Sequence, residues 1–166
     1  MDFDQTPNWI SPAFNGDNTS GSGERVIFLS PDCPRGLATA SAGFALQRRV
    51  YQGKASALYR ASCRQSGATV ALKSYAKSRL SGLNWGQVAR EVRLHGSLRH
   101  PAVIQLYAAF EDAHSIHLVM EYAAGGDVFG ALRAAGGRCG EAQALHVVRS
   151  CLEGVAYLHS RGIIHR

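Results

Sequence analysis

Short apolar runs separated by polar turns extend along the chain from Phe44 onward. Each run has the length and the branched or aromatic content of a β-strand, and Gly-containing turns separate the first three. The five strands predicted in this way are Phe44–Val50, Ala57–Cys63, Thr69–Tyr75, Ile104–Phe110 and Ile116–Glu121. The pattern changes to helical spacing between the third and fourth strands and again after the fifth.

Helical periodicity predicts three helices. They cover residues 84–98, a short segment that begins near Asp127, and Glu141–His159. In the first helix Val88, Val92 and His95 form an apolar stripe, and Asn84 is the expected N-cap. Gly162 is expected to end the last helix. The elements together predict an α+β fold, in which a five-stranded antiparallel sheet carries one long helix and the first helices of a helical unit follow.

Residues 1–43 have a different composition. They hold four of the five prolines and a run rich in Gly, Ser and Asn over residues 15–23, with little periodicity. Such a segment is typical of a flexible tail. The apolar stretch Val26–Leu29 is the exception, and we interpret it as a docking segment. The predicted organisation is a disordered tail over residues 1–43 and a folded domain over residues 44–166.

Charge is distributed unevenly along the chain. The net charge is +6, but residues 44–110 hold eleven basic residues and a single acidic one, Glu91, so this segment alone carries +10. A surplus of this kind favours an anionic partner, such as nucleic acid, acidic lipid or the phosphates of a nucleotide. The alternative is that most of these basic residues simply form a solvated surface.

Composition excludes several classes of protein. No apolar run approaches the roughly 18 residues that a membrane helix needs, and the acidic start lacks the apolar core of a signal peptide. The four cysteines form no CxxC pair and the seven histidines form no HExxH motif, which argues against a metal site or a disulfide framework. We therefore expect a cytoplasmic protein with free thiols.

A lysine lies in the middle of the third predicted strand. Because side chains alternate along a strand, Ala71 and Lys73 face one side, and Val70 and Leu72 face the other. Glu91 lies within the apolar stripe of the following helix. A buried ammonium group is costly unless it is paired, so we expect Lys73 to pair with Glu91. From these two residues alone, the alternative that Lys73 and Glu91 lie on the surface and do not contact each other is equally well supported.

Short motifs along the chain remove this ambiguity. In order they are Val70-Ala71-Leu72-Lys73, Glu91, Arg99-His100-Pro101, Leu118-Val119-Met120-Glu121-Tyr122, Gly125-Gly126-Asp127, Tyr157-Leu158-His159-Ser160 and Ile164-His165-Arg166. In this order and spacing the sequence strongly resembles a eukaryotic protein kinase over residues 44–166, closest to the Aurora and polo-like serine/threonine kinases. The resemblance implies an N-lobe over residues 44–122, and a hinge with part of the helical C-lobe over residues 123–166.

The resemblance also implies a binding site for ATP. Lys73 would hold the α- and β-phosphates, and Glu91 would fix its position. Four apolar residues would surround the adenine ring: Val50, Leu58, Ala71 and Met120, the last of them as gatekeeper. Backbone groups of Glu121 and Ala123 would pair with the edge of the adenine, and Asp127 would accept hydrogen bonds from the ribose.

The glycine-rich loop departs from the kinase pattern. Only its central glycine, Gly53, is present, whereas Tyr51 and Ser56 occupy the positions of the first and third glycines, and Ala55 replaces the aromatic residue at the tip. Glycines allow backbone N–H groups to approach phosphate closely. We therefore expect weakened nucleotide affinity.

His165 and Arg166 open the catalytic-loop motif, and the given sequence stops one residue before the expected catalytic aspartate. The family's base and its Mg²⁺ ligands are therefore not among these 166 residues, and we expect the chain on its own not to phosphorylate a protein substrate. A pseudokinase-like regulatory module is the alternative. A nucleic-acid-binding domain is disfavoured, because the aromatic residues are not interleaved with the arginines.

The resemblance implies the partners of the chain, and the sequence patterns described above imply the absence of nucleic-acid and membrane partners. The partners are ATP, an unidentified protein substrate, and an activating protein at the helix over residues 84–98, with no nucleic acid and no membrane. Family analogy adds the nucleus, centrosome or cilium to the cytoplasm as locations.

Overall fold

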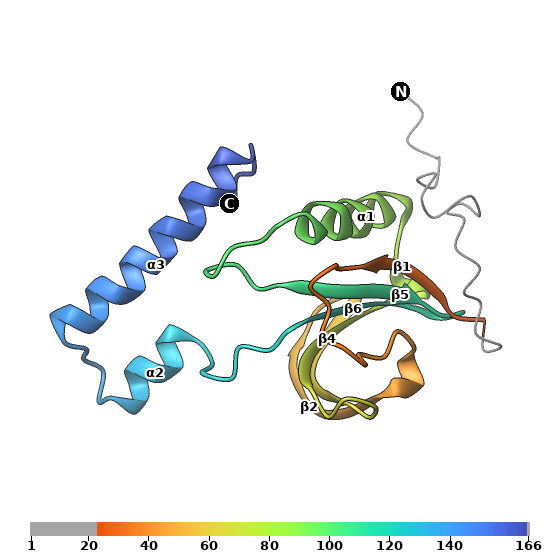
Figure 1. The fold of residues 1–166 in the computed structure, drawn as a ribbon, viewed down its shortest axis with the longest axis horizontal. Coiled ribbons are helices and arrows are strands. Elements are labelled where there is room, and N and C mark those ends of the chain that lie inside the picture. The colour runs from red at the N-terminus through yellow and green to blue at the C-terminus, as the bar shows by residue number, and fades with distance from the viewer. Residues whose placement is uncertain (1–22, 166) are drawn as a thin grey trace. The chain divides into compact units, whose positions relative to one another are not determined.

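A six-stranded antiparallel sheet dominates the first part of the chain (Figure 1). The structure is a computed structural model, and it describes residues 23–165. The strands are β1 (Arg25–Leu29), β2 (Phe44–Gln52), β3 (Ser56–Cys63), β4 (Thr69–Ala76), β5 (Leu106–Glu111) and β6 (Ser115–Glu121). Their order across the sheet is β1-β5-β6-β4-β3-β2, and every neighbouring pair is antiparallel.

Helix α1 (Gly82–Gly96) lies against one face of this sheet (Figure 1). Its buried side includes Val88 and Val92, as the apolar stripe predicts. The predicted N-cap at Asn84 is wrong, because Ser81 has the extended conformation of a cap residue and the helix begins directly after it. The backbone N–H of Asn84 donates to the Ser81 carbonyl over 2.9 Å, which places Asn84 inside the first turn.

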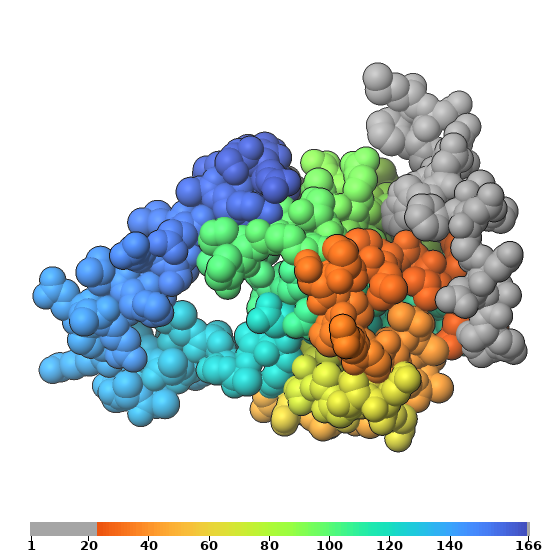
Figure 2. All heavy atoms as spheres, viewed as in Figure 1, coloured from red at the N-terminus to blue at the C-terminus, as the bar shows by residue number. Residues whose placement is uncertain are grey.

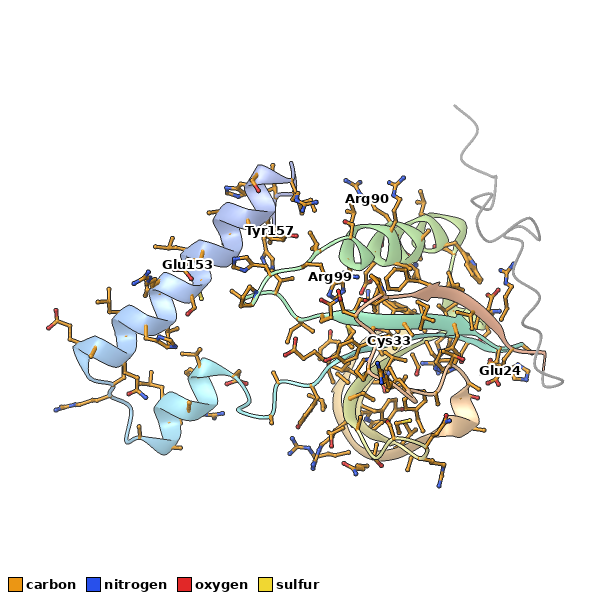
Figure 3. The ribbon with its side chains drawn as sticks, viewed as in Figure 1. Glu24, Cys33, Arg90, Arg99, Glu153 and Tyr157 are labelled. Carbon is orange, nitrogen blue, oxygen red and sulfur yellow. The ribbon has the colours of Figure 1, made fainter. Side chains whose placement is uncertain are left out.

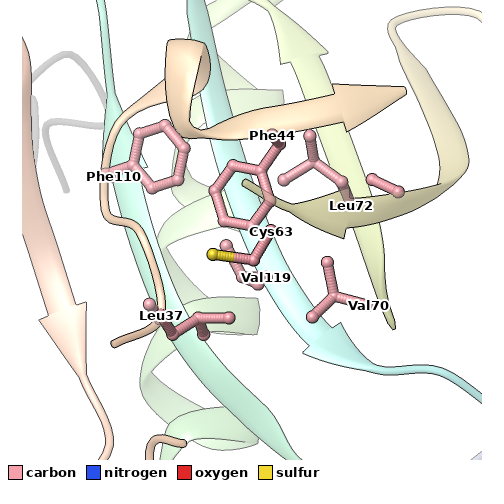
Figure 4. Packing of buried hydrophobic residues seen from close by; sticks show 9 residues of the cluster. Leu37, Phe44, Cys63, Val70, Leu72, Phe110 and Val119 are labelled. Atoms are coloured by element: carbon pink, nitrogen blue, oxygen red, sulfur yellow. The ribbon is translucent and has the colours of Figure 1, made fainter. Parts of the chain in front are cut away.

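The two faces of the sheet carry two separate apolar clusters. The face turned away from α1 packs Val70 and Leu72 with residues of the other strands and of the segment before β2, including Phe44, Cys63 and Phe110 (Figure 4). The face toward α1 carries a second cluster: Ala71, Tyr75, Val88, Val92, Leu106, Ala109, Ile116, Leu118 and Met120. The alternation predicted for the third strand is therefore confirmed.

The prediction of a disordered tail is wrong for the described part of residues 1–43. Residues 25–29 form β1, which pairs with β5, so the sheet has six strands and not the five predicted. Leu37 is buried in the first apolar cluster, and the buried carboxylate of Glu24 accepts hydrogen bonds from the backbone and hydroxyl of Ser41, each over 2.7 Å. The rest of the predicted tail, residues 1–22, lies outside the described residues.

The chain divides into two compact units, and the second comprises Arg99–Ile104 and Ala123–Arg166. It contains α2 (Val128–Ala134) and α3 (Glu141–Ser160), at the positions that the periodicity predicts. The backbone N–H of Arg99 donates to the hydroxyl of Tyr157 on α3 over 2.8 Å (Figure 3).

Helix α3 ends at Ser160, and Gly162, the residue expected to end it, lies in the turn that follows. Gly162 has φ +69°, and its N–H donates to the His159 carbonyl while that of Ile163 donates to the Leu158 carbonyl, both over 2.9 Å. These two bonds satisfy carbonyls that the helix end would leave unpaired. Within residues 23–165, no helix is long and apolar enough to cross a membrane.

Candidate functional site

Lys73 on β4 and Glu91 on α1 meet between the sheet and the helix. Lys73 Nζ donates to Glu91 Oε1 over 2.8 Å. The strand and the helix position these groups, because Lys73 lies on the face toward α1 and Glu91 lies on the side of α1 toward the sheet. The two side chains are 28% and 29% exposed. The pair is therefore half-buried and not fully desolvated, which is less burial than the sequence argument assumed.

Tyr75 completes the coordination of the Glu91 carboxylate, and the sequence analysis missed it. Its hydroxyl donates to Glu91 Oε2 over 2.6 Å, so both oxygens of the carboxylate have a partner. Lys73 Nζ lies 5.0 Å from the centroid of the Tyr75 ring, within the range of a cation–π contact. Tyr75 follows Lys73 by two residues and therefore shares its face of β4, so the alternation of the strand was a signal that could have identified it.

The hydroxyl of Tyr75 stays a donor over a wide pH range. Burial raises its pKa, and the hydrogen bond to Glu91 and the negative charge of Glu91 raise it further. A protonated phenol is what an ionised carboxylate requires of a hydrogen-bond partner. Lys73, Glu91 and Tyr75 thus form one preorganised unit, in which an ammonium group is held by a carboxylate that is itself held by a phenol.

Three of the four predicted adenine-site residues share the face that carries Lys73. In the register of the sheet Ala71 lies opposite Met120, and Leu58 lies opposite Lys73. Ala71 and Met120 are buried, and Leu58 packs against the same cluster. The fourth residue, Val50, lies where the register of β2 with β3 shifts, and its side chain is 48% exposed. Val50 is thus not packed into this cluster.

The turn between β2 and β3 contains Gly53, and its surroundings are crowded. The Gly53 N–H donates to the Ser56 carbonyl over 2.8 Å, and the side-chain amide of Gln52 donates to the carbonyls of Gly53 and Ser56. A Cβ atom on Gly53 would lie 3.2 Å from Ser56 Oγ and 3.3 Å from the Tyr51 ring. Tyr51 and Ser56, which replace the first and third glycines of the kinase pattern, therefore fill the space beside Gly53.

The end of β6 leads into the segment predicted to contain the hinge. The Glu121 N–H donates to the Gln105 carbonyl over 2.9 Å, and Glu121 Oε2 accepts from the Gln105 N–H over 3.1 Å. Because the Glu121 N–H already donates to Gln105, the N–H is not the backbone group of Glu121 that would pair with adenine. Ala123 and Asp127 belong to the second unit, where Asp127 Oδ1 accepts from the Gly130 N–H over 2.5 Å and caps α2. Their contacts with a nucleotide stay predictions.

The residues present fit ATP better than they fit a metal ion. A held ammonium group suits phosphate oxygens, and a small Ala71 opposite Met120 suits a flat apolar ring. In the part of the chain that the structure describes, no group of three or more His, Cys, Asp or Glu could hold a metal ion. All four cysteines are free thiols, as expected.

These features define a protein kinase N-lobe and the start of its C-lobe. They are a six-stranded sheet with one packed helix, further helices after it, and a strand lysine that pairs with a helix glutamate. Residues 44–166 match the protein kinase domain family, so the chain belongs to that family.

Three curated relatives share the name serine/threonine-protein kinase PLK4. The protein of Drosophila ananassae is 34% identical over 124 residues, covering 74% of this chain and 16% of the relative. The protein of Aedes aegypti is 36% identical, covering 69% of this chain and 15% of the relative. The protein of Nematostella vectensis is 37% identical, covering 69% of this chain and 12% of the relative. The chain thus spans less than a fifth of these relatives. Their name supports the polo-like part of the resemblance and does not support the Aurora-like part.

Proposed function

We propose that this chain is the ATP-binding portion of a serine/threonine protein kinase. The observation that carries the proposal is the Lys73–Glu91 ion pair, with 2.8 Å between Nζ and Oε1. In a complete kinase domain, ATP supplies the phosphoryl group, and the hydroxyl oxygen of a protein serine or threonine forms the new bond to the γ-phosphorus as the bond to ADP breaks.

Each residue of the site has a separate task in this proposal. Lys73 presents a positive charge to the α- and β-phosphates, and Glu91 and Tyr75 keep that charge in one place before the nucleotide arrives. Ala71, Met120 and Leu58 exclude water from the adenine ring. Preorganisation of this kind matters because phosphoryl transfer depends mainly on positioning and on electrostatic stabilisation.

A pseudokinase-like regulatory module is the second candidate function. The crowded turn around Gly53 favours it, because Tyr51 and Ser56 occupy positions where glycine would let backbone N–H groups approach phosphate. The two candidates differ in whether nucleotide binding by this chain depends on Lys73.

Calorimetric titration with ATP in a magnesium buffer tests the proposal. We expect the 166-residue chain to bind ATP, and Lys73→Met to weaken binding at least about tenfold, because hydrogen bonds to charged groups contribute about 1.5–3 kcal/mol. Arg90→Met is the matched control, because this exposed residue of α1 points away from the sheet (Figure 3). Equal affinity of Lys73→Met and Arg90→Met would remove Lys73 from its proposed role, and no binding by any variant would favour the regulatory module.

Partners and location are proposed on family analogy alone. We infer a protein substrate with serine or threonine hydroxyls, an activating protein at α1, and a cytoplasmic location with the nucleus, centrosome and cilium as alternatives. Fluorescence imaging of the tagged protein tests the location.

A further inference from the structure

Strand β1 precedes the residues that match the kinase family, yet it is part of the sheet. It pairs with β5 from Arg25 opposite Glu111 to Leu29 opposite Ala108. After the strand, the Ser30 N–H donates to the Tyr107 carbonyl over 2.8 Å. β1 thus covers the edge of β5 that would otherwise expose its backbone groups.

The first residue of β1 is bound to the segment that leads into α1. Glu111, only 9% exposed, accepts a hydrogen bond from Arg25 Nε over 2.8 Å, and its other oxygen lies 2.9 Å from Lys77 Nζ. Lys77 begins the short 3₁₀ helix Lys77–Arg79, a few residues before α1. A single buried carboxylate therefore joins β1 to the N-terminal side of α1.

Further along β1, Phe28 contacts the other end of α1. A Cβ atom built on Gly96, the last residue of the helix, would lie 2.9 Å from Cε2 and 3.0 Å from Cζ of Phe28. The ring therefore lies directly on the backbone of Gly96, an approach that a side chain at this position would prevent. Ile27 and Phe28 also pack against the cluster that includes Val88 and Val92 of α1. In Figure 2 the orange atoms of the first described residues, which include β1, lie next to the green atoms of the region that contains α1.

We propose that β1 holds α1 in the position in which Glu91 reaches Lys73, with Phe28 as a positioning residue of this ion pair. Glu91 lies five residues before Gly96, about 7.5 Å along a rigid helix. A shift of the helix end of 1–2 Å therefore moves Glu91 by a similar distance, which is enough to break a hydrogen bond of 2.8 Å. The consequence for nucleotide binding rests on the proposed function.

Phe28→Ala and Leu29→Ala form a matched pair in the full 166-residue chain. Both shorten an apolar side chain of β1, but the Leu29 side chain is 55% exposed and does not belong to the cluster at α1. We expect Phe28→Ala to speed amide hydrogen exchange over residues 82–96 and to weaken ATP binding at least about threefold. Leu29→Ala should leave both quantities unchanged. Equal behaviour of the two variants would overturn the proposal.

Gly96→Ala displaces the ring without changing β1. Alanine favours a helix over glycine, so intrinsic propensity alone predicts slower amide exchange in α1. If the Phe28 contact positions the helix, the new methyl group pushes the ring away and exchange becomes faster. Slower exchange in Gly96→Ala would contradict the proposal. If Phe28→Ala does not fold, Phe28→Leu, which keeps an apolar side chain but loses the ring, takes its place.

A double-mutant cycle with Glu91→Gln separates positioning from general stability. If Phe28 acts through Glu91, the loss of ATP affinity caused by Phe28→Ala should fall below about twofold once Glu91 is replaced. A full, additive loss in that background would show that Phe28 supports only the fold. If the unchanged chain binds no ATP, the proposed function fails, and amide exchange over residues 82–96 alone decides whether β1 positions α1.

Discussion

Tyr75→Phe tests the hydrogen bond that completes the Glu91 carboxylate. The substitution removes only the hydroxyl that donates to Glu91 Oε2 over 2.6 Å. The ring, which belongs to the cluster below α1, is kept, and so are the groups of the Lys73–Glu91 pair. Any change therefore reports the one hydrogen bond and not a cavity in the core.

The magnitude follows from the chemistry of the bond and the exposure of the acceptor. A hydrogen bond to a charged group contributes about 1.5–3 kcal/mol to the free energy of unfolding. Glu91 is 29% exposed, so water replaces part of the lost interaction. We expect Tyr75→Phe to lower the free energy of unfolding by about 1 kcal/mol. A similar loss in the positioning of Lys73 corresponds to roughly fivefold weaker ATP binding.

Urea titration at a series of pH values provides the assay. Because the pKa of Tyr75 is raised in the folded chain, the unfolded chain loses this proton first, near the ordinary tyrosine value of 10. The contribution of Tyr75 is therefore fully present below pH 10 and is lost as the pH rises above it. The stability difference between the unchanged chain and Tyr75→Phe should shrink from about pH 10 upward. Equal stability at neutral pH, or a difference that grows with pH, would refute the reasoning.

Two further substitutions test local structure. Burial alone would raise the pKa of Asp112, but hydrogen bonds from His117 and from two backbone N–H groups outweigh it and lower the pKa below 3.8. This stabilisation is present above pH 3.8 and is lost as the pH falls. Asp112→Asn should therefore reduce the loss of unfolding free energy that urea titration measures as the pH falls below this value. An unchanged dependence on acid pH would contradict this. Gly162→Ala, at φ +69°, should lower the free energy of unfolding by about 1 kcal/mol in thermal unfolding. Gly86→Ala, inside α1 with open space around it, should raise stability slightly, because alanine favours a helix over glycine; equal losses in the two variants would argue against backbone strain at Gly162.

Most strands and helices of the described chain can be predicted from the sequence because their signals are local. Alternation in Thr69–Tyr75 and the stripe of Val88 and Val92 depend on neighbours a few residues away, and both are found in the structure. β1 could not be predicted in this way. Its partner strand lies about eighty residues further along, and the composition around Val26–Leu29 resembles a flexible tail. The open edge of β5, the buried carboxylate of Glu111 and the absence of a side chain at Gly96 together explain why this segment is ordered, and all three are tertiary features.

The residues of the candidate ion pair could be predicted from the sequence, but their burial and their other contacts could not. Motif order identified Lys73 and Glu91, yet the sequence argument assumed deep burial, whereas both side chains are more than a quarter exposed. Burial depends on how closely α1 approaches the sheet, which is a tertiary property. The alternation of β4 places Tyr75 on the face of Lys73, but a tyrosine on an apolar face is typical of a core residue, so the sequence does not indicate its hydrogen bond. Its hydrogen bond depends on the position of α1 as well.

The unit of Lys73, Glu91 and Tyr75 favours nucleotide binding, whereas the β2–β3 turn disfavours it. The two act through different interactions. Lys73 acts through charge, which tolerates small displacements of a phosphate, and it is positioned by β4 and α1 without any contribution from the turn. Backbone N–H groups act only at close approach, which Tyr51 and Ser56 hinder at Gly53. A nucleotide held by this chain would therefore depend mainly on electrostatic attraction, which is weakened by salt. The lysine, and not the turn, is for this reason the residue whose replacement separates an ATP-binding kinase portion from a regulatory module.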